Sequence, residues 1–292
     1  MDHSDDSTID ADSLFGSDTG HKELEDAFLT PNNNAVIASR SVPPIPGMFF
    51  MPNLLPHELH DRVLHQVSEC EYFDLGTERD SHSLEIPESQ RSHRNQVMLF
   101  SRSLASPWSA KSHGNSRERY QALPEDTEPS DCAGLPGWTI EFIQQLRQLI
   151  MAESETRLPL SVKEMLFPGD KLLSRQLILN LYNGAEGLAP HVDLVHRFAD
   201  GILLCSFGPH GTGTVMDFTH KSHPAEHLFL PSGSVLVLSG EARYDWKHGI
   251  SARDCDFVYS ADGPHRIDKL KRSIRLSITI RSMLPGADVV GE

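Results

Sequence analysis

The stretch APHVDLVHRF, residues 189–198, places three potential metal ligands close together: His191, Asp193 and His196. Imidazole nitrogens and carboxylate oxygens are common ligands of divalent transition metals. Residues two apart in a β-strand point to the same face, roughly 6–7 Å apart at Cα. If 191–195 is a strand, His191 and Asp193 can share one metal ion, whereas His196 leaves that face. The spacing predicts part of a metal site that lacks one ligand.

The missing ligand has to come from a histidine farther along the chain. His248, in RYDWKHGI, begins an extended run, where a histidine is either a packed core residue or a ligand. The segment HKSHPAEH is a rival site, but its polar, proline-interrupted sequence is typical of an exposed hairpin loop and lacks zinc-finger spacing. The glycines of GPHGTG, around His210, disfavour a rigid ligand. The downstream candidates are His210, His220, His223, His227, His248 and His265.

The segment RLSITIR, near the end of the chain, alternates between apolar and polar residues. Such alternation predicts a strand with an apolar face on the core. The other face, with Arg275 and Arg281, is either solvated or lines a cavity where an arginine pairs with a carboxylate. Two histidines and one carboxylate leave three coordination positions open, which is typical of non-haem Fe(II) oxygenases. The polar face carries Arg275, Ser277, Thr279 and Arg281, and Asn180 and Tyr182 alternate similarly in LILNLY.

These side chains must be positioned by a sheet. After Phe167, short apolar runs are separated mostly by Gly, Pro, Asn or Asp, which indicates successive strands. Two helices are expected before them, in LPHELHDRVLHQVSEC and GWTIEFIQQLRQLIMAES, with QVMLF as an isolated strand. The pattern predicts a mostly β (α+β) barrel or sandwich with buttressing helices. The eight predicted strands are RQLILNLY, HVDLV, GILLCSF, GTVMDFT, HLFLP, SVLVLSG, WKHGIS and RLSITIR.

Charge and cysteine usage restrict the possible environments. The net charge is −15, and an acidic protein is a poor partner for nucleic acid unless its basic residues cluster. They do so mildly over 79–119, which is either a solvated loop or a phosphate-facing patch. The four scattered cysteines favour free thiols, the start of the chain lacks the order of a signal peptide, and no run is long enough for a membrane helix. We therefore expect a cytoplasmic or nuclear protein that does not enter membranes.

The domain organisation follows from the same patterns. Residues 1–40 are acidic and polar, and we expect a disordered tail that could bind a partner protein. Residues 41–284 form the expected folded domain, with a lid or loop region over 74–135 and the strand-rich core over 168–283. Residues 285–292 are expected to be a C-terminal tail.

The ordered motifs resemble the AlkB family of Fe(II)- and 2-oxoglutarate-dependent dioxygenases. The order is Asn180-x-Tyr182, His191-x-Asp193, His248 followed by Gly-Ile, and then the alternating strand that begins at Arg275. The similarity covers roughly residues 42–283, and SGEARYDWKHGI is especially similar to eukaryotic AlkB homologues. The resemblance implies a double-stranded β-helix, or jelly-roll, core.

The resemblance also implies the roles of the site residues. His191, Asp193 and His248 would bind Fe(II), and Arg275 would pair with the distal carboxylate of 2-oxoglutarate. Arg281 would brace both that cosubstrate and Asp193. The remaining cosubstrate contacts would come from Asn180, Tyr182, Ser277 and Thr279.

The implied reaction consumes O₂ and 2-oxoglutarate, releases succinate and CO₂, and hydroxylates a C–H bond of the substrate. If that carbon is an N-methyl group, the hydroxylated product releases formaldehyde. We expect N-alkylated bases of DNA or RNA as the substrate. The acidic charge leaves open a protein hydroxylase or demethylase, and a non-enzymatic jelly-roll interaction module is the third alternative. The segment 101–135 matches no family motif.

Overall fold

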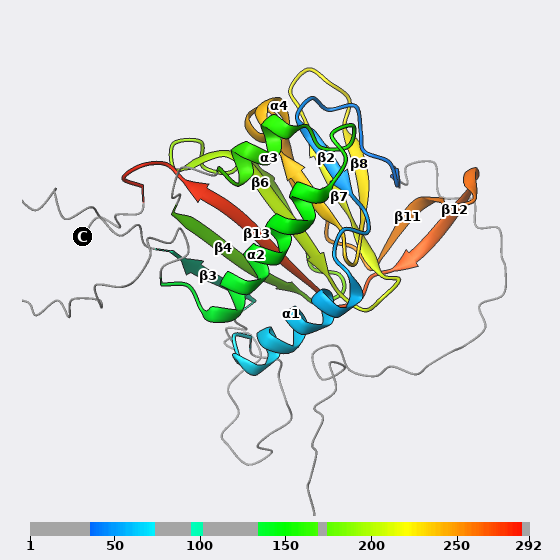
Figure 1. Ribbon diagram of the computed structural model, residues 1–292. Helices are drawn as coiled ribbons and strands as arrows, with labels where there is room; N and C mark the ends of the chain where they lie inside the picture. Colours follow the sequence, from blue (N-terminus) through cyan, green and yellow to red (C-terminus); the bar gives the residue numbers. More distant parts are fainter. Residues whose placement is uncertain (1–35, 74–94, 102–133, 169–173, 288–292) are drawn as a thin grey trace, which may run out of the picture.

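The computed structural model describes residues 36–73, 95–101, 134–168 and 174–287 (Figure 1). In these residues, two antiparallel sheets face each other and helices cover the outer face of the larger one. The predicted mostly β fold with a jelly-roll core is thereby confirmed. The order in the large sheet is β2 (Met48–Met51), β9 (Val235–Leu238), β6 (Phe198–Phe207), β13 (Arg275–Met283), β4 (Arg175–Tyr182) and β3 (Gln96–Phe100).

The smaller sheet is built from the chain segments that lie between strands of the larger one. From β4 onward the chain passes repeatedly between the two sheets, which is the double-stranded β-helix winding. This winding brings residues far apart in the sequence onto the two facing surfaces. The order in the small sheet is β5 (Leu188–His191), β10 (Lys247–Ile250), β7 (Gly213–Thr219) and β8 (Glu226–Pro231).

The alternation of each large-sheet strand separates two cores. On β13, Leu276, Ile278 and Ile280 face the helices and join a core with helical residues such as Phe142 and Leu146. The opposite faces of the strands supply Leu204, Leu236 and other apolar residues to a second core between the sheets. The polar face of β13 therefore points into the jelly roll, and the solvated-face alternative for that strand is excluded.

The two predicted helices are present as α1 (His57–Glu69) and α2 (Gly137–Ala152). Burial of Leu59, Val63 and Val67 confirms the predicted apolar stripe of α1. On α2, Leu146 is buried and Arg147 is exposed. The helices α3 (Leu160–Leu166) and α4 (Gly240–Tyr244) were not expected, because seven and five residues are too few for a clear helical period.

A third, smaller sheet also departs from expectation. It consists of β1 (Ile37–Ala38), β11 (Cys255–Ser260) and β12 (Gly263–Lys271), and Figure 1 shows the β11–β12 hairpin projecting from the body. Pairing of Ile37 with Phe257 starts regular structure at residue 37, before the expected boundary at 41. Residues 1–35 of the acidic tail lie outside the described residues.

Two further sequence-based expectations concern cysteines and membranes. Cys70, Cys205 and Cys255 are free thiols, and Cys132 lies outside the described residues. Within the described ranges, none of the helices has both the length and the apolar character needed to cross a bilayer.

Gly47, just before β2, offers a test of the packing between β2 and α4. Its φ is +82°, and a Cβ atom there would lie 2.0 Å from the carbonyl oxygen of Ser239. We expect Gly47→Ala to lower the free energy of unfolding by about 2 kcal/mol or more, since backbone strain alone costs of order 1–3 kcal/mol. Urea denaturation measures this loss. Gly137→Ala, at the open start of α2, is the matched control and should be neutral or stabilising; equal losses would contradict the packing described.

Candidate functional site

His191, Asp193 and His248 converge at one end of the small sheet. His191 ends β5 and pairs across the ladder with His248 on β10, so their rings lie 4.5 Å apart. The carboxylate of Asp193 lies between them: its Oδ1 is 4.0 Å from His191 Nε2, and its Oδ2 is 3.8 Å from His248 Nε2. One ligand atom from each residue falls within 4.8 Å of the others, which suits a single metal ion.

Asp193 is not held by the strand that the sequence predicted. β5 stops at His191, and residues 192–194 have no regular secondary structure. The buried guanidinium of Arg243 on α4 instead donates to the carbonyl oxygen of Asp193 at 2.9 Å and to that of Leu194 at 3.4 Å. These two contacts turn the backbone away from the ladder and direct Asp193 inward. Sequence reasoning missed Arg243, because a five-residue helix has no readable period.

The negative charge of Asp193 is compensated by Arg281, a positively charged residue on the large sheet. Arg281, on the polar face of β13, places its Nη2 2.5 Å from Asp193 Oδ1. Arg281 Nη1 is 3.5 Å from the amide oxygen of Gln176, its neighbour on β4. Gln176 was also missed, although it shares the period-two alternation of Asn180 and Tyr182. Asp193 Oδ2, by contrast, is buried without a hydrogen-bond partner among the described residues.

The contacts of the two histidines suit metal binding. His191 Nδ1 donates to the carbonyl oxygen of Ala189 at 3.0 Å, which leaves Nε2 as the ring nitrogen that faces Asp193. Burial lowers the pKa of His248 to about 4, against the opposing effect of the nearby Asp193. The His248 imidazole is therefore uncharged near neutral pH, which is the form that binds metals.

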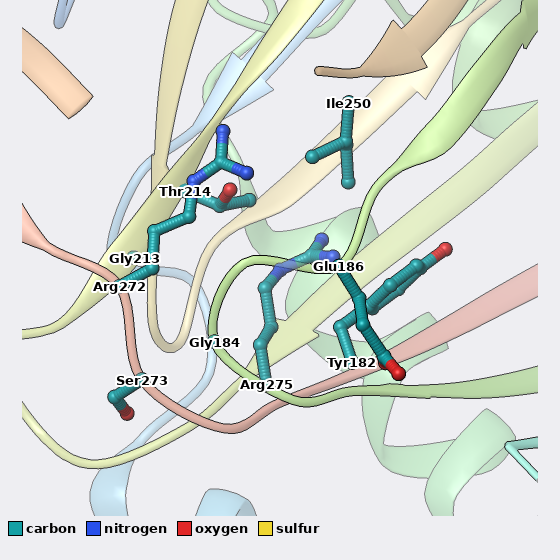
Figure 2. Close-up of a pocket in the computed structure, with 9 residues that line it drawn as sticks. All are labelled: Tyr182, Gly184, Glu186, Gly213, Thr214, Ile250, Arg272, Ser273 and Arg275. Carbon is teal, nitrogen blue, oxygen red and sulfur yellow. The ribbon is translucent and has the colours of Figure 1, made fainter. Parts of the chain in front are cut away.

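Arg275 presents an unpaired cation on the same face of β13. Its side chain is buried; Nη2 donates to Ser206 Oγ at 3.0 Å, while Nε and Nη1 have no hydrogen-bond partner among the described residues. Figure 2 shows Arg275 in a small pocket beside Tyr182, which Ile250, two residues past His248, also lines. Burial lowers the pKa of Arg275 to about 10, so it stays charged at neutral pH. Its unused donors require an acceptor such as a carboxylate.

The other predicted cosubstrate residues lie along the same strands. Tyr182 packs its ring 5.5 Å from the Arg275 guanidinium carbon, and burial raises the pKa of its hydroxyl. Asn180 pairs across the sheet with Ser277, and its Oδ1 accepts a hydrogen bond from Gln96 Nε2 at 2.6 Å. Ser277 and Thr279 are buried on the β13 face that carries Arg275. Ser206, absent from the predicted set, is a lone polar residue in the apolar run GILLCSF.

The remaining histidine candidates lie elsewhere. His196 is exposed on the turn after Asp193, and none of the three histidines of HKSHPAEH joins a metal-binding group among the described residues. His220 and His223 contact the ring of Trp246, while His227 binds Asp217. His210 lies at a second cluster, together with His60 and Asp61. Most of the basic stretch 79–119 lies outside the described residues.

Arg281 is expected to stabilise the fold through Asp193 even without metal. Arg281→Gln leaves a buried carboxylate without its ion-pair partner, and we expect a loss of about 3 kcal/mol in the free energy of unfolding. Urea denaturation in the presence of EDTA measures it. Arg266→Gln is the control: Arg266 is 65% exposed in its pair with Asp268, so the expected loss is below about 1 kcal/mol. A loss of this smaller size in both variants would show that the Asp193 charge needs no offset.

The side chains at these two positions fit a metal ion and a small carboxylic acid. The partnerless Oδ2 of Asp193 between two imidazole Nε2 atoms suits a divalent cation, and two histidines with one carboxylate suit Fe(II). The partnerless guanidinium atoms of Arg275 suit a carboxylate of a small acid. Both sites face the interior of the same jelly roll.

Comparison with known proteins agrees with this chemistry. The tRNA (carboxymethyluridine(34)-5-O)-methyltransferase alkbh8 of Xenopus tropicalis is 37% identical over 117 residues, which are 37% of this chain and 18% of that protein. The alpha-ketoglutarate-dependent dioxygenase alkB homolog 7, mitochondrial, of Bos taurus is 34% identical over 122 residues, 41% of this chain and 50% of that protein. The AlkB resemblance is thus confirmed over part of the chain, which spans half or less of these two relatives.

A solved structure and a family model match a larger part of the chain. The structure of OsALKBH1 matches 81% of this chain and 98% of its own, at 18% identity and a TM-score of 0.42. The model of the 2OG-Fe(II) oxygenase superfamily matches residues 47–281, a range that includes the triad and both arginines of β13. This match extends over most of the chain, which therefore belongs to the 2OG-Fe(II) oxygenase superfamily.

Proposed function

We propose that this oxygenase removes N-alkyl groups from bases of nucleic acid, with His191, Asp193 and His248 as its Fe(II) ligands. The observation that carries the proposal is the convergence of these three residues in the jelly roll whose interior also holds Arg275, with two guanidinium nitrogens that lack a hydrogen-bond partner among the described residues. Arg275, assisted by Ser206, would bind the distal carboxylate of 2-oxoglutarate. Asn180, Tyr182, Ser277 and Thr279 would line the rest of the cosubstrate site. Arg281 would hold Asp193 in place through its ion pair.

The roles of these side chains are binding, orientation and exclusion of water. When bound, Fe(II) and 2-oxoglutarate supply oxidation by O₂: one oxygen atom enters succinate as CO₂ leaves, and the other hydroxylates a substrate C–H bond. His191 and His248 would offer ring nitrogens to the metal, and the contact of His191 Nδ1 with the Ala189 carbonyl oxygen fixes the ring of His191. The apolar core between the sheets closes the site from the inner side, which limits access of bulk water.

A group of exposed apolar side chains, here called the rim, is an argument for a flat substrate. Leu194 and Val195 follow Asp193 and are each 50% exposed, and Met98 and Phe100 on β3 are also exposed. Gln176 contacts both Met98 and Arg281, and Arg281 is the ion-pair partner of Asp193. Unstacked bases bind to apolar and aromatic side chains of this kind. Two relatives, whose names refer to tRNA modification and to alkylated DNA repair, support the same class of substrate.

The substrate class is tested by measuring formaldehyde release from methylated RNA, DNA and peptide pools with Fe(II), 2-oxoglutarate and ascorbate. We expect release from methylated oligonucleotides, matched by succinate, and none from an Asp193→Ala variant. Release from peptides alone would overturn the nucleic-acid proposal in favour of a protein demethylase. We also propose a cytoplasmic or nuclear location, supported by the free thiols of Cys70, Cys205 and Cys255.

A further inference from the structure

A second group of metal-binding side chains lies where α1 meets the turn between β6 and β7. His60 and Asp61 are on α1, and His210 is in the turn. Asp61 Oδ1 is 2.8 Å from His60 Nδ1 and 3.1 Å from His210 Nε2, and the three ligand atoms all lie within 4.8 Å of one another. The glycine-rich turn that disfavoured His210 as a rigid ligand is therefore held against a helix.

His60 is buried and oriented by a hydrogen-bonded neighbour. Its Nε2 is 2.8 Å from Ser232 Oγ, whose hydroxyl donates to the carbonyl oxygen of Gly208 at 2.8 Å. The backbone N–H of Gly208 also donates to this nitrogen, at 3.5 Å. These contacts hold the ring with Nδ1 facing Asp61. A histidine that is held through one ring nitrogen presents the other to a cation.

His60 Nδ1 lies 2.8 Å from Asp61 Oδ1, so either a proton or a metal ion joins these two atoms. Asp61 and His210 are each 47% exposed, so an ion can enter from solvent. His57, one helical turn before His60, has its ring tilted against that of His210, with 4.3 Å between the ring centroids. Two imidazoles and one carboxylate suit Zn²⁺, with water in the fourth position.

We propose that His60, Asp61 and His210 form a zinc-class divalent cation site that fastens α1 to the β6–β7 turn. The site is separate from the proposed oxygenase site and does not rest on the proposed function. Bond lengths of about 2.0–2.2 Å would require the three ligand atoms to move only slightly apart around the ion. Its expected effect is structural, because α1 covers the outer face of the large sheet.

The test uses the full chain with His191→Ala and Asp193→Ala, which removes the other metal site. We expect equilibrium dialysis to show one tightly bound Zn²⁺, and Co²⁺ in its place to give the visible absorption of a four-coordinate site. Adding His210→Ala should weaken binding at least about 100-fold, more than the usual loss from an outer-shell change. Zn²⁺ should also raise Tm in the parent variant but not after His210→Ala.

His65→Ala is the matched control, because His65 lies on the same helix, pairs with Glu69 and stands outside the cluster. It should leave Zn²⁺ affinity unchanged. Absence of a bound ion in the variant without His191 and Asp193 would mean that a proton alone joins His60 Nδ1 and Asp61 Oδ1, and it would overturn the proposal. Equal losses in the His210→Ala and His65→Ala variants would do the same, since they would indicate unspecific binding by surface histidines.

Discussion

Replacing His248 by alanine is expected to lower Fe(II)-dependent conversion of 2-oxoglutarate to succinate by more than about 100-fold, beyond the usual effect of an outer-shell residue. The imidazole is buried, uncharged near neutral pH and 3.8 Å from the partnerless oxygen of Asp193. No other described histidine lies in the same group except His191, so a neighbour cannot replace it. Succinate formation and bound iron, measured on the same sample, should both fall.

The control for His248 is His196→Ala. His196 is exposed on the turn that follows Asp193 and is not in the metal-binding group, although it is closer in sequence to His191 than His248 is. It should keep the parental rate and iron content. If the His196 variant loses iron while the His248 variant keeps it, the assignment of the third ligand is wrong.

The second large effect concerns Arg275 and the cosubstrate. Arg275→Met removes the guanidinium whose Nε and Nη1 have no hydrogen-bond partner within the described parts of the chain. Truncating one side of a buried charged pair costs roughly 2–5 kcal/mol, and the middle of that range corresponds to about a 100-fold or larger rise in KM for 2-oxoglutarate. Arg275→Lys should recover part of the affinity, because it restores the charge without the planar fork.

The Arg275 effect must be separated from a general loss of structure. Bound iron and Tm should change little in the Arg275→Lys variant, while KM for 2-oxoglutarate rises more than kcat falls. Lys271→Met, which removes an exposed charge four residues earlier, should leave KM unchanged. An unaltered KM in both Arg275 variants would show that the carboxylate of 2-oxoglutarate binds elsewhere.

Much of the fold was predictable because its strands alternate clearly. RQLILNLY coincides with β4 and GTVMDFT with β7, and the alternation of β13 correctly separated a helix-facing from an interior face. The third sheet was missed because β12, with its His, Arg and Lys residues, has no apolar period. Which strands lie side by side could not be predicted from periodicity, because periodicity indicates which face of a strand is apolar but not which strand pairs with it.

The residues of the candidate site could be predicted from the sequence, but the contacts that hold them in place could not. Residue types and order pointed to His191, Asp193 and His248, and the structure brings all three together. The expected strand through Asp193 was wrong, because Arg243 takes up the carbonyl groups that a ladder would have used. Contacts of this kind join segments about fifty residues apart and depend on the tertiary fold, so no local pattern reveals them.

The central claim is that this chain oxidises 2-oxoglutarate with iron held by His191, Asp193 and His248. Its most direct test is uncoupled turnover: purified protein with Fe(II), ascorbate and O₂, and succinate measured against 2-oxoglutarate consumed. The structure predicts succinate equimolar with the 2-oxoglutarate consumed, and no enzymatic turnover after His191→Ala. A protein that makes no succinate although it holds stoichiometric iron, or a His191→Ala variant that retains the parental rate, would contradict it.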